Sequence, residues 1–310
     1  MSEGAKNPSS TPVFVDLHIH GAFGVDVLTA SAAEMDRLAV GLWASGVAAF
    51  LPTLVPLPLA EMAAAVSRIA AWMRTRREGD GRGAMPLGLH FEGPFVSPAR
   101  CGALHRQDFL DGTDARRVDA FFEAAAGFPG RGMTTLAPEI PGGIAVAREF
   151  ARRGFVVSIG HTEADVEALE AALAAGARHM THFGNAMKPL HHRAAGPVGW
   201  GLVTDGVTVD VIADGHHLSP EMLRLVIRAK GDGRVALISD AMPAAGLGDG
   251  DYAAWGETLA VRDGQARNAS GALAGSTALL DDCVRHLAGI VPEEVAIRAA
   301  SEVPRRLLAS

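Results

Sequence analysis

The chain alternates short apolar runs with longer segments whose apolar residues recur at a helical period. Each apolar run ends at or close to a polar residue, which is typical of a buried strand in a parallel sheet. The runs predict eight strands, at residues 13–20, 49–55, 87–92, 133–139, 155–161, 179–182, 208–217 and 234–240.

Segments rich in Ala and Leu separate these strands and predict helices, among them 61–77, 144–153, 164–175 and 220–230. Thr162 is expected to cap the third of these helices, because its hydroxyl can accept a hydrogen bond from a first-turn amide. Strands that alternate with helices form a parallel sheet, and eight such units close into a (β/α)8 TIM-type barrel. We predict this α/β barrel over residues 13–310, after a disordered N-terminal tail at residues 1–12.

Residues 241–275 follow the last predicted strand and are rich in turn-forming residues. This stretch is too long for an ordinary connection, and long loops at the C-terminal end of a barrel usually cover a substrate. Within it, 257–261 and 265–267 predict a small hairpin around Asp263-Gly264. We therefore expect a loop and hairpin insertion over the site.

The composition and charge of the chain indicate one large globular domain. The 310 residues are 48% hydrophobic, enough for one large core, and the net charge of −7 comes without any long basic run. Nucleic acid is therefore not an expected partner. No apolar run approaches the roughly 20 residues of a membrane span, so no membrane partner and a cytoplasmic location are expected. Cys101 and Cys283 are expected to be reduced thiols.

Polar side chains at the strand ends predict a metal centre. His18 and His20 are two apart in a strand, so both can face the barrel mouth and bind one ion. Glu92 is presented at the mouth by the Gly93-Pro94 turn, and a carboxylate there needs compensation that a metal ion would provide. The predicted ligands, each at the end of an apolar run, are His18, His20, Glu92, His161, His182 and Asp240.

Two further histidines and the last carboxylate receive different roles. His179 falls on the opposite side of its strand from His182 and is expected to pack, whereas His90 lies deeper than Glu92 and is expected to support a ligand. Asp240 can take a proton from water and later protonate a leaving group, because a metal ion lowers the pKa of bound water to roughly 7. The alternative for Asp240 is a structural, helix-capping carboxylate.

Several motifs occur together in one order. Asn185-Ala-Met187, His192-Arg193, Ile212-Ala-Asp-Gly215 and Leu273-Ala-Gly-Ser276 accompany the segments GLHFEGPF, LAPE and SIGHT. Together they resemble the N-acetylglucosamine-6-phosphate deacetylases of the amidohydrolase superfamily, from Val15 to about Leu308. The resemblance implies metal-dependent hydrolysis of the acetamide of N-acetylglucosamine 6-phosphate to glucosamine 6-phosphate and acetate, a step of amino-sugar catabolism.

The resemblance also implies roles for individual residues. Glu92, His161 and His182 match the shared metal ligands, Asp240 the catalytic acid/base, and His217 the histidine that polarises the substrate carbonyl. Arg193 matches a phosphate-binding arginine, whose planar fork can donate two bonds to one phosphate. Further substrate contacts are implied for Ala103, Leu104, Asn185, Ala186, Leu273, Ala274 and Gly275.

The cofactor implied is one or two divalent ions per subunit, because the His18-x-His20 motif is retained. Zinc is expected first, with iron or manganese as alternatives. The family suggests a homodimer. In the family, segments that precede and follow the barrel in the sequence together form a small β-domain beside it. We expect that domain to be largely absent here, because only about a dozen residues precede Val13.

Three questions stay open at this point. Gly102-Ala-Leu-His105 differs from the Gly-Ala-His of relatives, which leaves the role of His105 open. The substrate could be another N-acyl amino sugar or a cyclic amide, and the choice between glucosamine and galactosamine is not determined. A metal-binding barrel without activity is the third alternative, which the retained Asp240 disfavours.

Overall fold

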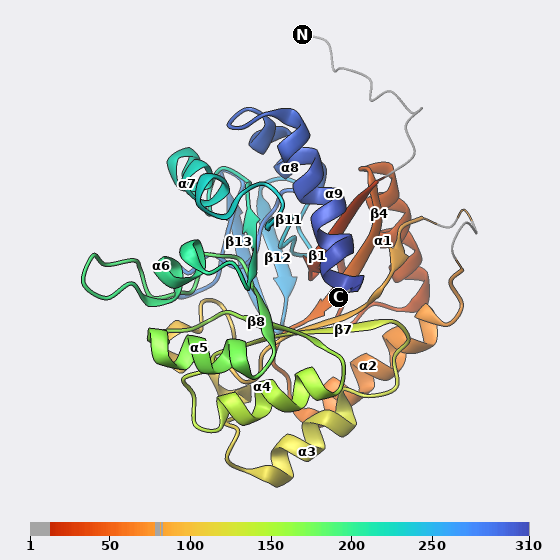
Figure 1. Ribbon diagram of the computed structural model, residues 1–310. Coiled ribbons are helices and arrows are strands. Elements are labelled where there is room, and N and C mark those ends of the chain that lie inside the picture. The colour runs from red at the N-terminus through yellow and green to blue at the C-terminus, as the bar shows by residue number, and fades with distance from the viewer. Residues whose placement is uncertain (1–12, 78–80, 82, 310) are drawn as a thin grey trace.

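Eight parallel strands form the barrel in the computed structural model, which describes residues 13–77, 81 and 83–309 (Figure 1). The tail predicted at residues 1–12 lies outside the described residues. Neighbouring strands pair in the order β1 (Phe14–Ile19), β4 (Val47–Leu54), β6 (Gly88–Glu92), β7 (Arg131–Leu136), β8 (Val156–Ile159), β9 (Ala177–Met180), β10 (Thr208–Ile212) and β11 (Val235–Ile238).

The ends of this sheet meet just beyond the last strand. Ile19 and Ala241 form a parallel bridge, and the Asp240 amide donates to the carbonyl oxygen of His18 at 3.0 Å. A short strand, β5 (Met85–Pro86), pairs with β4 outside the ring. The predicted (β/α)8 barrel and its eight strands are thereby confirmed.

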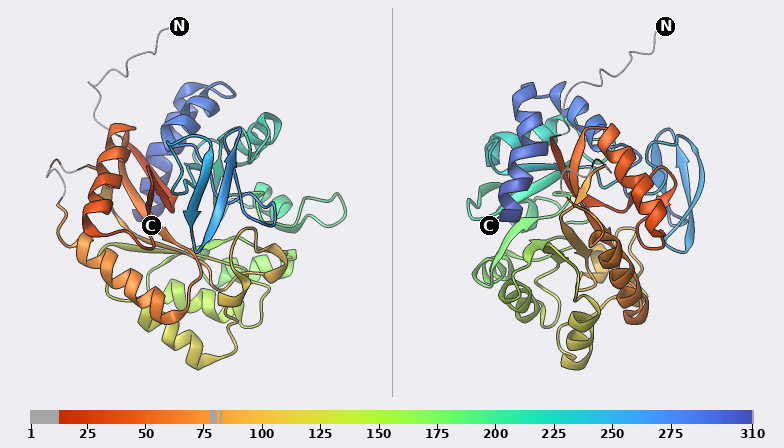
Figure 2. Two further views of the ribbon diagram at one scale, coloured as in Figure 1. Left: turned by 180° about the vertical axis from the view of Figure 1, so that it is seen from behind. Right: turned by 90° about the vertical axis from the view of Figure 1, so that its right-hand side faces the viewer.

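Helices cover the outside of the barrel, as a parallel sheet requires when both of its faces are buried (Figures 1 and 2). They are α1 (Ala32–Ala44), α2 (Leu59–Met73), α3 (Ala115–Ala124), α4 (Gly143–Arg152), α5 (Val166–Ala174), α6 (Gly196–Val203), α7 (Pro220–Lys230), α8 (Leu280–Ala288) and α9 (Glu293–Ala309), with 3-10 turns at Pro98–Arg100 and Arg106–Asp108. The four predicted helices are present as α2, α4, α5 and α7. No helix among these described residues has both the length and the apolar character needed to cross a bilayer.

The prediction that Thr162 caps α5 was wrong. Asp165 is the cap, and its side chain accepts a hydrogen bond from the Ala168 amide at 3.0 Å. Thr162 instead donates from its hydroxyl to Glu139 at 2.6 Å, which ties the end of β8 to the loop after β7. A helix that starts a few residues later leaves His161 in the loop above the barrel.

The buried apolar residues form one main cluster and two smaller ones. The second cluster contains Val15 and Leu17 of β1 together with Val303 and Leu307 of α9. The last helix therefore packs directly on the barrel strands, in agreement with its contacts to β1 and β11. Burial of such large aliphatic side chains contributes about 1.5–3 kcal/mol each.

The segment after β11 folds into a small antiparallel sheet of β12 (Gly250–Ala254), β13 (Glu257–Arg262) and β14 (Gln265–Arg267). The predicted hairpin is present, with its turn at Asp263-Gly264 and strands paired from Arg262–Gln265 to Ala260–Arg267. Its apolar side packs on Met242. A second short pair, β2 (Gly21–Ala22) and β3 (Val25–Asp26), follows β1.

Candidate active site

The six predicted ligands meet at the C-terminal end of the barrel. His18 lies in β1, Glu92 ends β6, and the other four follow within two residues of the ends of their strands. All six are buried, and Asp240, the most exposed, is only 7% exposed. Residues far apart in the sequence therefore share one small volume, because the ends of parallel strands point the same way.

One group of three side chains contains Glu92, His161 and His182. The two Nε2 atoms lie 3.1 Å apart, and they lie 3.0 and 3.1 Å from Oε1 of Glu92. Ligand atoms around a tetrahedral ion at 2.0–2.1 Å are separated by about 3.3 Å, so this triangle is close to the size that zinc would require.

A second group contains His18, His20 and the same glutamate. The Nε2 atoms of the two histidines are 3.0 Å apart, and Oε2 of Glu92 lies 3.3 Å from the His20 nitrogen. Oδ1 of Asp240 is 3.4 Å from Nε2 of His18 and 3.3 Å from Nε2 of His20. Glu92 is thus shared by the two groups, and Asp240 reaches the second of them.

The donor chemistry of both groups fits a divalent cation. Nδ1 of His161 donates to the Arg100 carbonyl at 2.7 Å and Nδ1 of His20 to that of Thr53 at 3.3 Å, so in these tautomers each Nε2 presents a lone pair. Burial opposes protonation of His20 and His182, but the Glu92 and Asp240 carboxylates outweigh it and raise their pKa values to about 10 and about 9. The carboxylates therefore favour positive charge here, which a metal ion would supply.

Three of these residues hold a strained backbone. His161, His182 and Asp240 have φ angles of 48°, 33° and 49°, in the left-handed region that L-residues rarely adopt. Each such residue costs on the order of 1–3 kcal/mol, and surrounding structure must hold it in place. All three occupy the turn directly after a barrel strand, where the strained backbone aims the side chain into the mouth.

A buried hydrogen-bond pair supports His182. Asp210 in β10 accepts from the His182 amide through Oδ1 and pairs with Nε2 of His179 at 2.8 Å through Oδ2. The expectation that His179 only packs was therefore wrong. His179 belongs to neither metal group, but it holds the carboxylate that fixes the backbone of a predicted ligand.

His90 lies below the ligands and belongs to neither metal group. Its Nδ1 faces the Leu17 carbonyl at 3.0 Å, and its Nε2 bonds the Thr135 hydroxyl at 2.8 Å. Its ring packs edge-on against the His18 ring at 4.6 Å. Burial and the neighbouring His18 keep the pKa of His90 well below its ordinary value, so this imidazole is neutral. These contacts match the support role predicted for it.

A cavity of about 210 Å³ opens above the ligands. It brings together most of the predicted substrate-contacting residues with His217. Among the described residues that line it there is no Lys or Arg. The lining residues are His20, Val55, Glu92, Gly102, Ala103, Leu104, His161, His182, Asn185, Ala186, His217, Asp240, Trp255, Ala272, Leu273 and Gly275.

His217 reaches this cavity from the loop after β10, held by Asp214. Nδ1 of His217 bonds Oδ2 of Asp214 at 2.8 Å, and Oδ1 of the same carboxylate accepts from the His216 and His217 amides. Ser276 donates to Oδ2 at 3.0 Å. These donors, with the charge of His217, outweigh burial and keep the pKa of Asp214 well below its ordinary value. The other ring nitrogen of His217 is left for a ligand.

Two predicted substrate residues do not line the cavity. Arg193 is exposed on the loop between β9 and α6, where its guanidinium bonds the His192 ring at 2.9 Å. Ala274 is fully buried in the apolar cluster beneath the small sheet, because its neighbours Leu273 and Gly275 face the cavity. His105 bonds Glu257 of β13 at 3.3 Å and lies outside the cavity.

Two residues of the site were missed by sequence reasoning. Trp255 lies in the turn between β12 and β13, and its ring packs edge-on against His20 at 5.1 Å. Asp214 lies in the Ile212-Ala-Asp-Gly215 motif, but the sequence predicted no role for it. An Asp three residues before a His in a turn-rich loop is a pattern that could have indicated this bond. No local signal connects Trp255 to the barrel mouth.

A barrel that gathers four histidines and two carboxylates at the C-terminal ends of its strands defines a hydrolase of the metal-binding type. The model of the amidohydrolase family matches residues 10–308, and this chain belongs to that family.

Relatives of this chain have names more specific than that of the family. The chain is 37% identical to N-acetylglucosamine-6-phosphate deacetylase of Bacillus subtilis, over 89% of this chain and 69% of the relative. It is 38% identical to N-acetylgalactosamine-6-phosphate deacetylase of Escherichia coli O157:H7, over 96% of this chain and 77% of that relative. The resemblance found in the sequence motifs is thereby confirmed.

Solved structures agree. A point mutant of N-acetyl-D-glucosamine-6-phosphate deacetylase from Mycobacterium smegmatis, in complex with N-acetyl-D-glucosamine-6-phosphate, matches with a TM-score of 0.88 and 32% identity, over 99% of this chain and 82% of the other. The deacetylase from Thermotoga maritima matches with a TM-score of 0.85 and 31% identity, over 96% and 78% of the two chains.

Proposed function

We propose that this protein hydrolyses the acetamide of N-acetylglucosamine 6-phosphate to glucosamine 6-phosphate and acetate, as a step of amino-sugar catabolism. The names of its relatives support this proposal. The observation that carries it is the shared cavity: the Asp240 carboxylate and the His217 imidazole line the same cavity as the predicted metal ligands. That arrangement offers both an acid/base and a hydrogen-bond donor to one amide group.

Glu92, His161 and His182 would hold one divalent ion, and His18 and His20 with Glu92 would hold a second. Zinc suits the imidazole and carboxylate donors best, and iron or manganese could replace it. When bound, such an ion acts as a Lewis acid and lowers the pKa of a water molecule.

Asp240 accepts the proton of the attacking water and then donates it to the amide nitrogen. A C–O bond forms at the acetyl carbon, the C–N bond breaks, and the sugar leaves as the amine. His217 donates a hydrogen bond to the carbonyl oxygen, where negative charge develops. The Asp214 carboxylate holds Nδ1 of His217 at 2.8 Å and places a negative charge beside the ring.

The sugar would occupy the space between the loops that carry Ala103 with Leu104, Asn185 with Ala186, and Leu273 with Gly275. These residues supply apolar contacts and one amide group, which suits a sugar ring whose hydroxyls keep part of their solvation. Ala274 would contribute only through its backbone. Arg193 is proposed to bind the 6-phosphate, and the lack of Lys or Arg among the described lining residues makes a cation from outside the cavity necessary.

A second candidate substrate is the galactosamine epimer, favoured by the relative from Escherichia coli that is 38% identical. The test is acetate release from N-acetylglucosamine 6-phosphate and N-acetylgalactosamine 6-phosphate, beside unphosphorylated N-acetylglucosamine. Release that depends on metal and on the phosphate would support the proposal. No release from any of them, with metal bound, would reject it in favour of another acyl substrate or an inactive barrel.

A cytoplasmic location and a homodimer complete the proposal. Both cysteines are free, which suits a reducing compartment. Size-exclusion chromatography with light scattering would test the assembly.

A further inference from the structure

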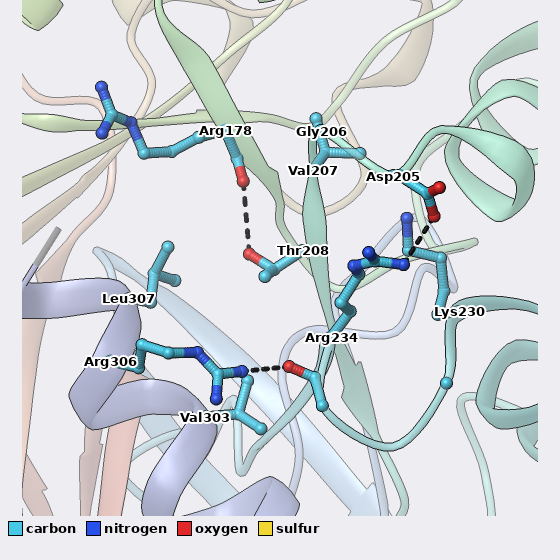
Figure 3. Close-up of a pocket in the computed structure, with 12 residues that line it drawn as sticks. Arg178, Asp205, Gly206, Val207, Thr208, Lys230, Arg234, Val303, Arg306 and Leu307 are labelled. Carbon is cyan, nitrogen blue, oxygen red and sulfur yellow. Dashed lines mark hydrogen bonds and ion pairs between the residues drawn. The ribbon is translucent and has the colours of Figure 1, made fainter.

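A second cavity lies at the opposite end of the barrel from the metal groups. It has a volume of about 640 Å³ and is lined where β9, β10 and β11 begin, together with the face of α9 (Figure 3). Thr208, the first residue of β10, lines it. At about 3.3 Å per residue, Thr208 is roughly 20 Å from the Asp214 loop at the other end of that strand. This cavity is therefore separate from the substrate cavity.

Basic residues outnumber acidic ones in its lining. Lys230, Arg234 and Arg306 line it from three segments, and Asp205 is the one carboxylate among the described lining residues. Arg178 contributes its backbone carbonyl, which accepts from the Thr208 hydroxyl, while its guanidinium points away (Figure 3). Figure 3 shows Lys230 and Arg234 side by side at Asp205, while Arg306 reaches in from α9. The excess of positive charge stands out on a chain whose net charge is −7.

The lysine is the most buried of these cations. Lys230 is 3% exposed, and its ammonium donates to the Thr204 carbonyl at 2.6 Å, which uses one of three N–H groups. Burial, and then the charge of Arg234, lower its pKa to about 8. An anion beside it would offset the cost of burying the charged ammonium and the repulsion from Arg234.

The arginines are held in place with donors to spare. Arg234 pairs with Asp205 at 2.5 Å, but the Asp205 side chain is 84% exposed, so this ion pair is weak and can open. Arg306 donates to the Gly233 carbonyl. Gly231 leaves open space, because a Cβ built there would meet no atom within 4 Å.

We propose that this cavity binds a small anion of the phosphate type, a phosphomonoester or inorganic phosphate, at a site independent of the deacetylase centre. Arginine forks and an ammonium group match the several oxygens of a phosphate. The volume falls in the range of small-molecule sites, about 300–1,000 Å³, and the cations are gathered in one hollow rather than spread over a long face. A small phosphate therefore fits better than a polyanionic chain.

The test uses two substitutions with opposite expected effects. Arg234→Gln removes a donor and should weaken the binding of inorganic phosphate about fivefold or more, whereas Asp205→Asn removes the competing carboxylate and should tighten it by about the same factor. Affinity is measured by isothermal titration calorimetry at constant ionic strength. Arg224→Gln, an exposed arginine of α7 outside the cavity lining, is the matched control and should bind like the wild type.

Glucose 6-phosphate and glucose form the second arm of the experiment. Tighter binding of the ester than of inorganic phosphate, with the same response to both substitutions, identifies a phosphomonoester; the reverse order identifies free phosphate, and either supports the site. Phosphate binding that neither substitution changes belongs elsewhere on the protein and overturns the proposal. So does an absence of saturable binding. The KM for the deacetylase substrate should stay unchanged in both variants, since a change would contradict an independent site.

Discussion

Oδ2 of Asp214 lies 2.8 Å from Nδ1 of His217, and this bond determines which ring nitrogen of the histidine faces the substrate cavity. The carboxylate is held in turn by two backbone amides and by the Ser276 hydroxyl. All four contacts are donors to Asp214, so the ionised carboxylate is the form that the site requires. His217 therefore has a fixed orientation and a negative charge beside its ring.

Asp214→Asn should lower kcat/KM by about 10- to 100-fold. The Asn side-chain oxygen would still accept hydrogen bonds from the backbone amides of His216 and His217. Its NH2 group would then face Nδ1 of His217, and the negative charge beside the ring would be lost. Steady-state acetate release measures this loss. Ser276→Ala removes one donor to the same carboxylate and leaves the His217 bond intact, so it should cost only a few-fold. Equal losses in the two variants would contradict a specific role for the Asp214–His217 bond.

Asp240→Asn should lower kcat by about 100-fold or more and leave the bound metal in place. The amide cannot take a proton from water, although it keeps the size of the carboxylate. Turnover is measured together with metal content. Asp251→Asn, an exposed carboxylate paired with Arg262 on the small sheet, is the matched control and should retain activity. Near-normal turnover of the Asp240 variant would rule out the proton-transfer role.

The fold could be predicted because each β-α unit carries its own local pattern. All eight strands were found, and α7 has the predicted bounds of 220–230, since Ser219 caps it and Pro220 begins it. The start of α5 was misplaced because Thr162 and Asp165 both suit an N-cap. The Thr162 hydroxyl donates instead to Glu139, a residue distant in the sequence, and this leaves Asp165 as the cap.

The meeting of the six predicted ligands at one place was predictable for a related reason. These residues end strands, and the geometry of a parallel barrel gathers strand ends without further information. Residues brought in by irregular loops were not predictable: Trp255 approaches His20 only because the small sheet folds back over the barrel mouth. The opposite error occurs at Arg193. Its motif predicted a position in the site, but the loop after β9 holds it outside the cavity.

Glu92→Gln should weaken metal binding more than the 10- to 100-fold typical of a residue that only supports a ligand. The two carboxylate oxygens of Glu92 approach both groups of histidines, so one neutral amide at this position should weaken metal binding at both. Metal content after dialysis against a graded chelator measures the effect. Glu221→Gln, exposed on α7, is the control. If the Glu92 variant kept the wild-type metal content throughout, the shared position of this carboxylate would have no role in binding.

Lys230 should make stability depend on alkaline pH. Its folded pKa of about 8 lies below the ordinary 10.5, so the unfolded chain binds more protons between these values and stability rises with pH across that window. The free energy of unfolding of the wild type relative to Lys230→Met should therefore increase by about 1–2 kcal/mol from pH 7 to pH 9.5. Urea unfolding in phosphate-free buffer measures it, with Lys188→Met as the exposed control. A pH-independent difference would contradict the lowered pKa.

Arg193→Ala should weaken the 6-phosphorylated substrate far more than the unphosphorylated sugar. A guanidinium that pairs with phosphate is worth roughly 1.5–3 kcal/mol, so kcat/KM for N-acetylglucosamine 6-phosphate should fall by about 10- to 100-fold, while that for N-acetylglucosamine stays within a few-fold. His192→Ala is the matched control, because it removes the ring that bonds Arg193 and leaves the guanidinium on the same exposed loop. Equal losses on both sugars would transfer phosphate binding to another residue, and the exposed position of Arg193 makes this comparison decisive for how the substrate is held.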